Sequence, residues 1–157
     1  MAVFAPRVPA LENRLLLVQK MAHRRHLRAV RNAAFLRKRL RIRLGRTPQP
    51  SAAIVDSQSV KSTGVGGEER GYDGGKKVKG RKRHILVDTE GLVLKAKVHS
   101  AKVMDYEGIK ILLKHADTAF PRLCHLWLDG GYRGEDKGKD WVEKTLGWSV
   151  DVVECPK

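Results

Sequence analysis

The chain has 157 residues and a formal net charge of +15. This length is sufficient for one domain with a hydrophobic core and a short extension. Its two cysteines, Cys124 and Cys155, belong to no C-x-x-C pair, which excludes a disulfide framework and a recognisable zinc motif. The sequence contains no apolar stretch of membrane-spanning length and no secretory signal pattern, so we expect a cytoplasmic protein without a membrane partner.

The positive charge is concentrated at one end of the chain. Residues 1–50 carry 13 Lys and Arg against one acid, whereas residues 105–157 carry eight against ten. A strongly basic segment favours a polyanion as its partner, and nucleic acid is the most common polyanion. The alternative is a solvated basic tail that binds nothing specific.

Residues 10–44 show apolar side chains at helical spacing, with arginine and lysine between them. Pro48 and Pro50 end this pattern and indicate a linker at about 45–50. The pattern predicts a basic helical arm over residues 1–48, which either lies along a phosphate backbone or has a solvated basic face. We recognise no helix-turn-helix pattern in the arm, so sequence-specific reading of DNA is not supported.

The middle of the chain predicts three strands. Ala52–Val60 is the first, apolar at its start and polar toward its end. Residues 62–83 are rich in Gly, Lys and Arg, and this composition predicts a flexible basic flap over a nucleic-acid backbone. His84–Asp88 and Leu92–His99 then predict a hairpin, whose second strand has one apolar face and one mostly basic face.

The last third of the chain predicts two helices that alternate with two strands. A helix over Asp105–Ala119, which Asp105 can cap, precedes a strand at Leu123–Leu128. A helix at 134–146 and a strand at Trp148–Val153 complete the pattern. The order β-β-β-α-β-α-β predicts an α/β domain with a mixed sheet over residues 49–157.

Two acids stand at the ends of apolar strands: Asp56 follows the run AAIV, and Asp129 follows the run LWL. In the predicted order the first and fourth strands can lie side by side, which would bring the two carboxylates together. Close carboxylates repel unless a cation lies between them, and a hard divalent ion such as Mg²⁺ accepts oxygen ligands.

Such a site favours two-metal phosphoryl transfer, with Asp56 as the candidate bridging ligand and Asp129 as the second ligand. The alternative is that Asp129 merely opens the turn at Gly130-Gly131, where Asp is common.

Three motifs then occur in order: PSAAIVDSQSVK from Pro50, GYD from Gly71 with KGRKRHILVDT from Lys79, and LDGGYRG from Leu128. Through them, residues 49–157 resemble the catalytic domain of DDE transposases of prokaryotic insertion sequences, in the group named after insertion sequence five. The resemblance implies a ribonuclease-H-like fold. It also implies DNA transposition, by Mg²⁺-dependent cleavage at transposon ends and strand transfer, with Mn²⁺ as the alternative ion.

The resemblance also implies roles for particular residues. It assigns Asp56 as the first catalytic and metal-binding acid and Asp129 as the second. It places several basic residues near DNA: Lys76, Lys79, Arg81, Lys82 and Arg83. The implied partners are transposon ends and target DNA, the family forms homo-oligomers, and the location is the nucleoid.

The chain departs from the family after its last predicted strand. The family's third metal ligand is a Glu on a helix beyond that strand, but this chain stops at Lys157. Glu143 precedes the strand, and we interpret it as a surface helix residue. We therefore expect a partial copy, truncated at the C-terminus, with little or no cleavage activity, so the sequence does not establish that the chain is itself an enzyme. The alternatives are a non-catalytic basic DNA-binding remnant and, against the ordered motifs, an unrelated RNA-binding protein.

Overall fold

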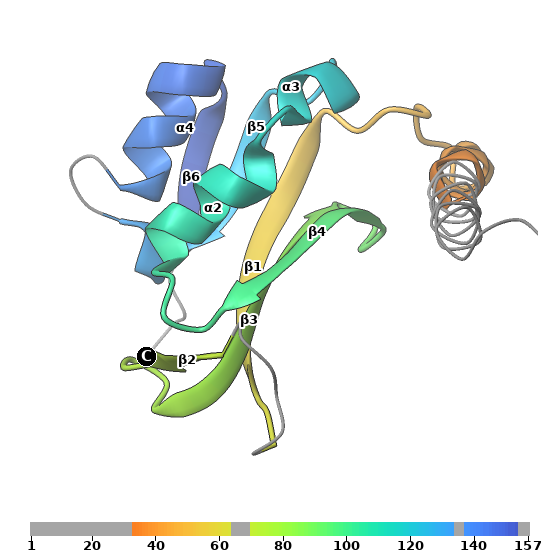
Figure 1. Ribbon diagram of the computed structural model, residues 1–157. Helices are drawn as coiled ribbons and strands as arrows, with labels where there is room; N and C mark the ends of the chain where they lie inside the picture. Colours follow the sequence, from red (N-terminus) through yellow and green to blue (C-terminus); the bar gives the residue numbers. More distant parts are fainter. Residues whose placement is uncertain (1–32, 64–69, 134–136, 154–157) are drawn as a thin grey trace, which may run out of the picture.

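The computed structural model describes residues 33–63, 70–133 and 137–153. The strands are β1 (Ala52–Lys61), β2 (Gly71–Asp73), β3 (Val78–Asp88), β4 (Val93–Ser100), β5 (His125–Asp129) and β6 (Ser149–Val153). The helices are α2 (Asp105–Leu113), α3 (Ala116–Ala119) and α4 (Gly138–Leu146), with a 3-10 turn, η1, at Gly130–Tyr132. Residues 33–43 form a further helix that precedes the sheet (Figure 1).

All six strands belong to one sheet with the order β2-β3-β1-β5-β6, and β4 also pairs with β3. β1 is antiparallel to β3 and parallel to β5, and β5 is parallel to β6. Gly80 of β3 pairs with Lys61 on one side and with Gly71 on the other, so β2 and β4 follow one another along the same edge of β3. This arrangement confirms the predicted α/β fold with a mixed sheet, and it places β1 beside β5.

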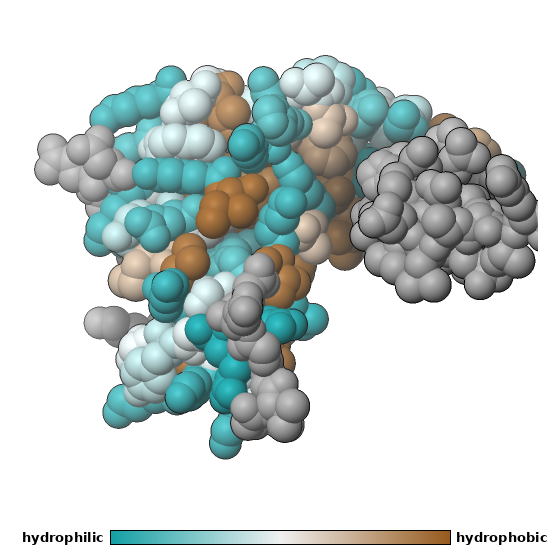
Figure 2. Space-filling view, viewed as in Figure 1, coloured by the Kyte–Doolittle hydropathy of each residue, from teal (hydrophilic) through white to brown (hydrophobic). Residues whose placement is uncertain are grey.

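The core lies between the sheet and helices α2 and α4. Along β1, Ala53 and Val55 are buried whereas Ile54 and Asp56 are exposed, because successive side chains of a strand point to opposite faces. The buried apolar side chains come from both layers and include Leu86, Ile109, Leu112, Leu126, Leu128 and Val142. The outer surface over α2 and α4 is mostly hydrophilic (Figure 2). Within the described residues, no helix is long and apolar enough to cross a membrane.

Residues 70–83 differ from the predicted flexible flap. They form β2, a tight turn and the first half of β3, while residues 64–69 of the predicted flap lie outside the described residues. The Asp73 carboxylate shapes the turn by accepting hydrogen bonds from the backbone N–H groups of Gly75 and Lys76, each at 3.1 Å. Composition alone predicted a flexible flap here because it does not reveal that this basic strand has an acidic partner in the core.

The predicted helix over Asp105–Ala119 is two helices. α2 ends at Leu113, and His115 adopts the left-handed conformation with φ 61° before α3 begins. A single left-handed residue ends a helix because it turns the following carbonyl and N–H groups out of the helical ladder. Asp105 is the first residue of α2 and does not cap it. The N-cap is Met104, and no side chain caps the helix.

The helix at residues 33–43 is attached to the domain by Arg41; residues 1–32 of the predicted arm lie outside the described residues. The Arg41 guanidinium forms an ion pair with the fully buried carboxylate of Asp88, and its Nε donates to the Thr47 carbonyl at 2.8 Å. Asp88 also accepts from the backbone N–H groups of Glu90 and Leu92. This buried charge is therefore well paired.

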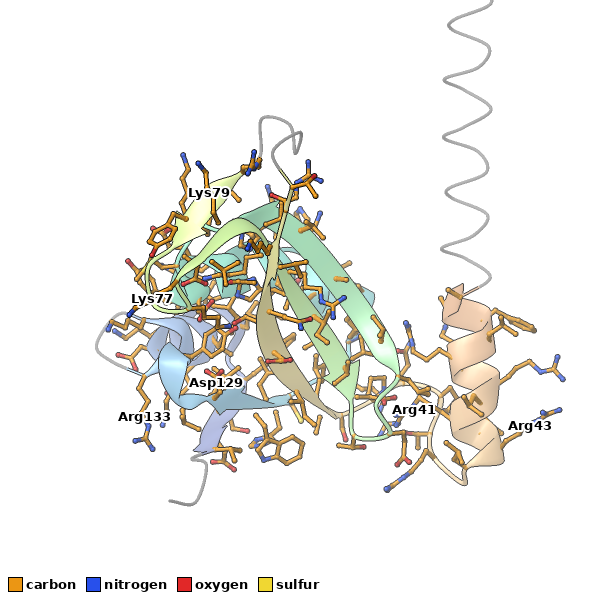
Figure 3. The ribbon with its side chains drawn as sticks, turned by 90° about the horizontal axis from the view of Figure 1, so that it is seen from below. Arg41, Arg43, Lys77, Lys79, Asp129 and Arg133 are labelled. Carbon is orange, nitrogen blue, oxygen red and sulfur yellow. The ribbon has the colours of Figure 1, made fainter. Side chains whose placement is uncertain are left out.

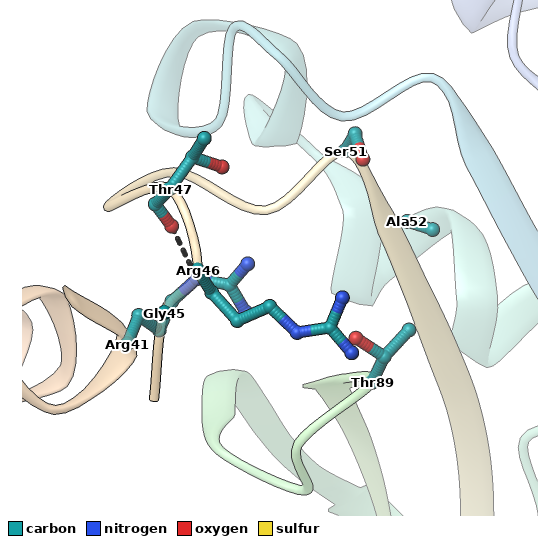
Figure 4. A pocket seen from close by; sticks show the side chains of 7 residues that line it. All are labelled: Arg41, Gly45, Arg46, Thr47, Ser51, Ala52 and Thr89. Atoms are coloured by element: carbon teal, nitrogen blue, oxygen red, sulfur yellow. Dashed lines mark hydrogen bonds between the residues drawn. The ribbon is translucent and has the colours of Figure 1, made fainter. Parts of the chain in front are cut away.

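A polar pocket lies at the junction of this helix with the sheet (Figure 4). It is lined by Arg41, Gly45, Arg46, Thr47, Ser51, Ala52 and Thr89. The Arg46 side chain extends across it toward Thr89, and its Nε donates to Glu90 at 2.8 Å. Both arginines of the junction are thus paired with acids, which indicates a structural role.

The Arg41→Met substitution tests this attachment. It leaves the Asp88 carboxylate buried without its cation, so the free energy of unfolding should fall by about 3–5 kcal/mol in urea denaturation. The matched control is Arg46→Met, which removes a pair whose arginine side chain is 57% exposed and should cost less than about 1 kcal/mol. Equal losses in the two variants would contradict the account.

Candidate active site

Asp56 and Asp129 lie on neighbouring strands. In the parallel ladder between β1 and β5, Ala52 pairs with His125 and Ile54 pairs with Trp127. The ladder ends at this last pair, and the same register continued two residues further would place Asp129 opposite Asp56. Both acids are exposed, on the sheet face opposite the buried side chains of their strands.

Backbone amides orient the two carboxylates. Asp56 Oδ1 accepts from the N–H of Ser57 at 2.7 Å, and Asp129 Oδ1 accepts from the N–H of Gly131 at 2.9 Å. Asp129 is the N-cap of η1, so it does open the turn at Gly130-Gly131. The turn therefore fixes the Asp129 carboxylate at the end of β5, in line with Asp56 on β1.

This arrangement fits a hydrated divalent cation. Two exposed carboxylates offer oxygen ligands of the kind that Mg²⁺ takes when it is held by one or two protein carboxylates and keeps several waters. Within the described residues, no group of three or more His, Cys, Asp or Glu is close enough to hold a metal ion. If an ion is bound here, Asp56 and Asp129 are the residues that would hold it.

A buried lysine, Lys82, lies on β3, the strand next to β1. The Lys82 ammonium is 3.1 Å from Asp73 Oδ2 and 3.0 Å from Asp105 Oδ1, and it donates to the Val103 carbonyl at 3.0 Å. Burial alone would lower the pKa of Lys82, but the bonds to Asp105 and Asp73 outweigh this effect and raise the pKa. This ion triplet, formed by Lys82, Asp73 and Asp105, ties β2, β3 and α2 together.

The position of Lys82 disagrees with the prediction that it contacts DNA. Its side chain is only 4% exposed and points into the core, because β3 alternates between buried and exposed residues. Lys79, Arg81 and Arg83 occupy the exposed positions of the same strand. The basic motif predicted a surface for all of its cations, but strand alternation sends one of them inward to its two acids.

The remaining predicted cations surround the site. Lys76 Nζ donates to the Ser57 carbonyl at 2.9 Å, which places its charge beside the residue that follows Asp56. Arg83 donates to the side chain of Gln58, also on β1. Lys79 lies on the same side of the domain as Asp129 (Figure 3). Lys77 and Arg133, which the sequence did not single out, lie on that side too. Lys77 is next to Lys76 in sequence and Arg133 belongs to the LDGGYRG motif, and these were the only signals for them.

Two buried polar side chains lie beneath the acids. Burial and the negative charges of Asp105, Asp129 and Asp56 raise the pKa of Tyr132. His84 is fully buried and stacked on His99, with His84 Nδ1 2.9 Å from His99 Nε2. Burial and the neighbouring charge of His99 lower the pKa of His84 to about 4. His84 is therefore neutral at pH 7.

Comparison with known protein families identifies the family of this chain. Residues 47–152 match the family described as Transposase DDE domain. The match spans more than half of the chain and includes β1, β5 and both acids, so the chain belongs to this family of DNA transposases. Searches of curated proteins and of solved structures found no match.

The lowered pKa of His84 predicts a pH dependence of stability. Between the ordinary pKa of 6.5 and about 4, the unfolded chain binds a proton that folded His84 does not. Stability should therefore fall as the pH drops through this window, by up to roughly 3 kcal/mol. Urea denaturation at several pH values measures this effect.

The His84→Gln variant should flatten this profile, and His115→Gln, at an exposed position, should leave it unchanged. A profile that keeps its slope in His84→Gln would show that another group is responsible.

Proposed function

We propose that Asp56 and Asp129 bind a divalent cation, Mg²⁺ or Mn²⁺, and that this chain acts on DNA at transposon ends and at the target. The observation that carries the proposal is that two exposed carboxylates lie on adjacent parallel strands, with exposed basic side chains on the neighbouring β3. The three ordered motifs support the insertion-sequence group named after insertion sequence five. DNA binding would associate the chain with the nucleoid, and self-association is proposed from the family alone.

The residues have distinct tasks in this proposal. The bound cation supplies the Lewis acidity that activates an attacking hydroxyl and stabilises the leaving oxygen. Asp56, in the middle of β1, and Asp129, at the end of β5, would hold the cation in positions set by their backbone hydrogen bonds. Lys79, Arg81 and Arg83 offer exposed charges to the phosphate backbone, with Lys76 beside β1.

We also propose that this chain cleaves DNA less well than a transposase whose metal site has three acids. In the part of the chain that the structure describes, Asp56 and Asp129 supply only two carboxylates to the cation, so we expect little or no cleavage of transposon-end DNA by this chain alone. A DNA-binding role without cleavage is the second candidate function, which the exposed basic positions of β3 favour. Robust Mg²⁺-dependent nicking that Asp56→Ala abolishes would refute the expectation of weak activity.

Removal of either acid should weaken metal binding. In titration calorimetry with Mg²⁺, Asp56→Asn and Asp129→Asn should each lower the affinity by at least about tenfold, because each removes an oxygen ligand. The control is Asp117→Asn, at an exposed position on α3. Mg²⁺ affinity that is the same in all three variants as in the unchanged chain would eliminate this site.

DNA binding should weaken steeply with salt. Replacing Lys79, Arg81 and Arg83 together by Gln should flatten the slope of log affinity against log salt by roughly one unit per lost phosphate contact. The charge-matched control replaces Lys114, Arg122 and Lys137, which are exposed outside the sheet. Fluorescence anisotropy with a short duplex measures both, and equal slopes in the two triple variants would argue against a DNA surface on β3.

A further inference from the structure

Asp105, the first residue of α2, lies close to one of the two candidate metal ligands, Asp129. Its Oδ1 is 3.0 Å from Lys82 Nζ and 3.6 Å from His84 Nε2. Its Oδ2 lies toward η1. A methyl group built on Gly131 would be 3.7 Å from Asp105 Oδ2 and 3.1 Å from Asp129 Oδ1. The two carboxylates therefore border the same methyl-sized space, which remains open because residue 131 is glycine.

Two buried polar atoms lie close to Asp105 without hydrogen-bond partners among the described residues. They are the Tyr132 hydroxyl and His84 Nε2, and both residues are fully buried. The Ser57 hydroxyl is near enough to Tyr132 to lower its pKa, but it does not reach good hydrogen-bond geometry. Buried polar groups are nearly always paired with protein or with ordered water. Ordered water beside Asp105 would satisfy both atoms.

The charges around this space favour a cation. The negative charges of Asp105, Asp129 and Asp56 all raise the pKa of Tyr132, and Asp105 has the largest effect of the three. Lys82 neutralises part of this charge from below, but it also pairs with Asp73. Lys76 is bound to the Ser57 carbonyl at the side. The three negative charges exceed these two positive charges, so a hydrated divalent cation would complement the site.

We propose that Asp105 is a third carboxylate of the candidate metal site and that it acts through water. Its Oδ2 accepts a hydrogen bond from the hydration shell of a cation held by Asp56 and Asp129, while Lys82 holds its Oδ1 in place. This inference rests on the proposed function. It agrees with the lack of any described group of three acids close enough to share an ion directly, since Mg²⁺ keeps several of its waters.

In this role Asp105 is a positioning residue. It orients water around the cation, and its orientation is set by the same lysine that binds Asp73. Outer carboxylates of this kind typically affect metal affinity tenfold or more. A merely structural role for Asp105 would instead change stability and leave metal affinity alone.

The first test compares Asp105 with a structural acid outside the site. Asp105→Asn should lower Mg²⁺ affinity about tenfold in titration calorimetry, because the amide keeps an oxygen for Lys82 but turns a donor toward the site. The matched control is Asp88→Asn, which replaces the buried carboxylate that pairs with Arg41 at the end of β3. It should lower the urea midpoint and keep Mg²⁺ affinity within about twofold. Affinity that falls in parallel with stability in both variants would overturn the proposal.

A second measurement needs no variant. The side-chain carboxyl carbons of Asp56, Asp129 and Asp105 should shift during a Mg²⁺ titration followed by NMR, all with one midpoint, while that of Asp73 stays in place. An Asp105 signal that does not move while those of Asp56 and Asp129 do would overturn the inference alone. If no carboxyl signal moves and Asp56→Asn binds Mg²⁺ like the unchanged chain, the proposed function itself fails.

Discussion

The ion triplet of Lys82, Asp73 and Asp105 is the interaction on which the site depends. A lysine with 4% exposure is tolerated only because two carboxylates and a carbonyl surround it. Asp73 meanwhile forms the turn that sends Lys76 toward β1, and Asp105 begins α2. One buried charge therefore sets the position of the β2–β3 turn and of the first turn of α2 relative to the acids.

The sheet separates structure from chemistry by its two faces. On β1 and β5, the inward side chains pack against α2 and α4, while Asp56, in the middle of β1, and Asp129, at the end of β5, occupy outward positions. The outward residues of β3 include Lys79, Arg81 and Arg83. Alternation along three adjacent strands thus brings acids and cations to one surface while the core remains apolar.

Sequence patterns predicted the strands around Asp56 and Asp129 because apolar runs and turn residues mark them, and they predicted that the two strands are neighbours. They did not predict β2 or the inward direction of Lys82, since both depend on Asp73, which lies nine residues before that lysine. Asp105 looked like an ordinary helix cap. Its position beside the acids depends on tertiary contacts with Lys82 and Gly131 that no local spacing reveals.

The most direct test of the central claim is anomalous diffraction from a crystal of the chain soaked in Mn²⁺. The account predicts a manganese peak within ligand distance of the Asp56 and Asp129 carboxylates. A manganese ion bound elsewhere, with these two carboxylates in contact only with solvent or protein, would contradict it.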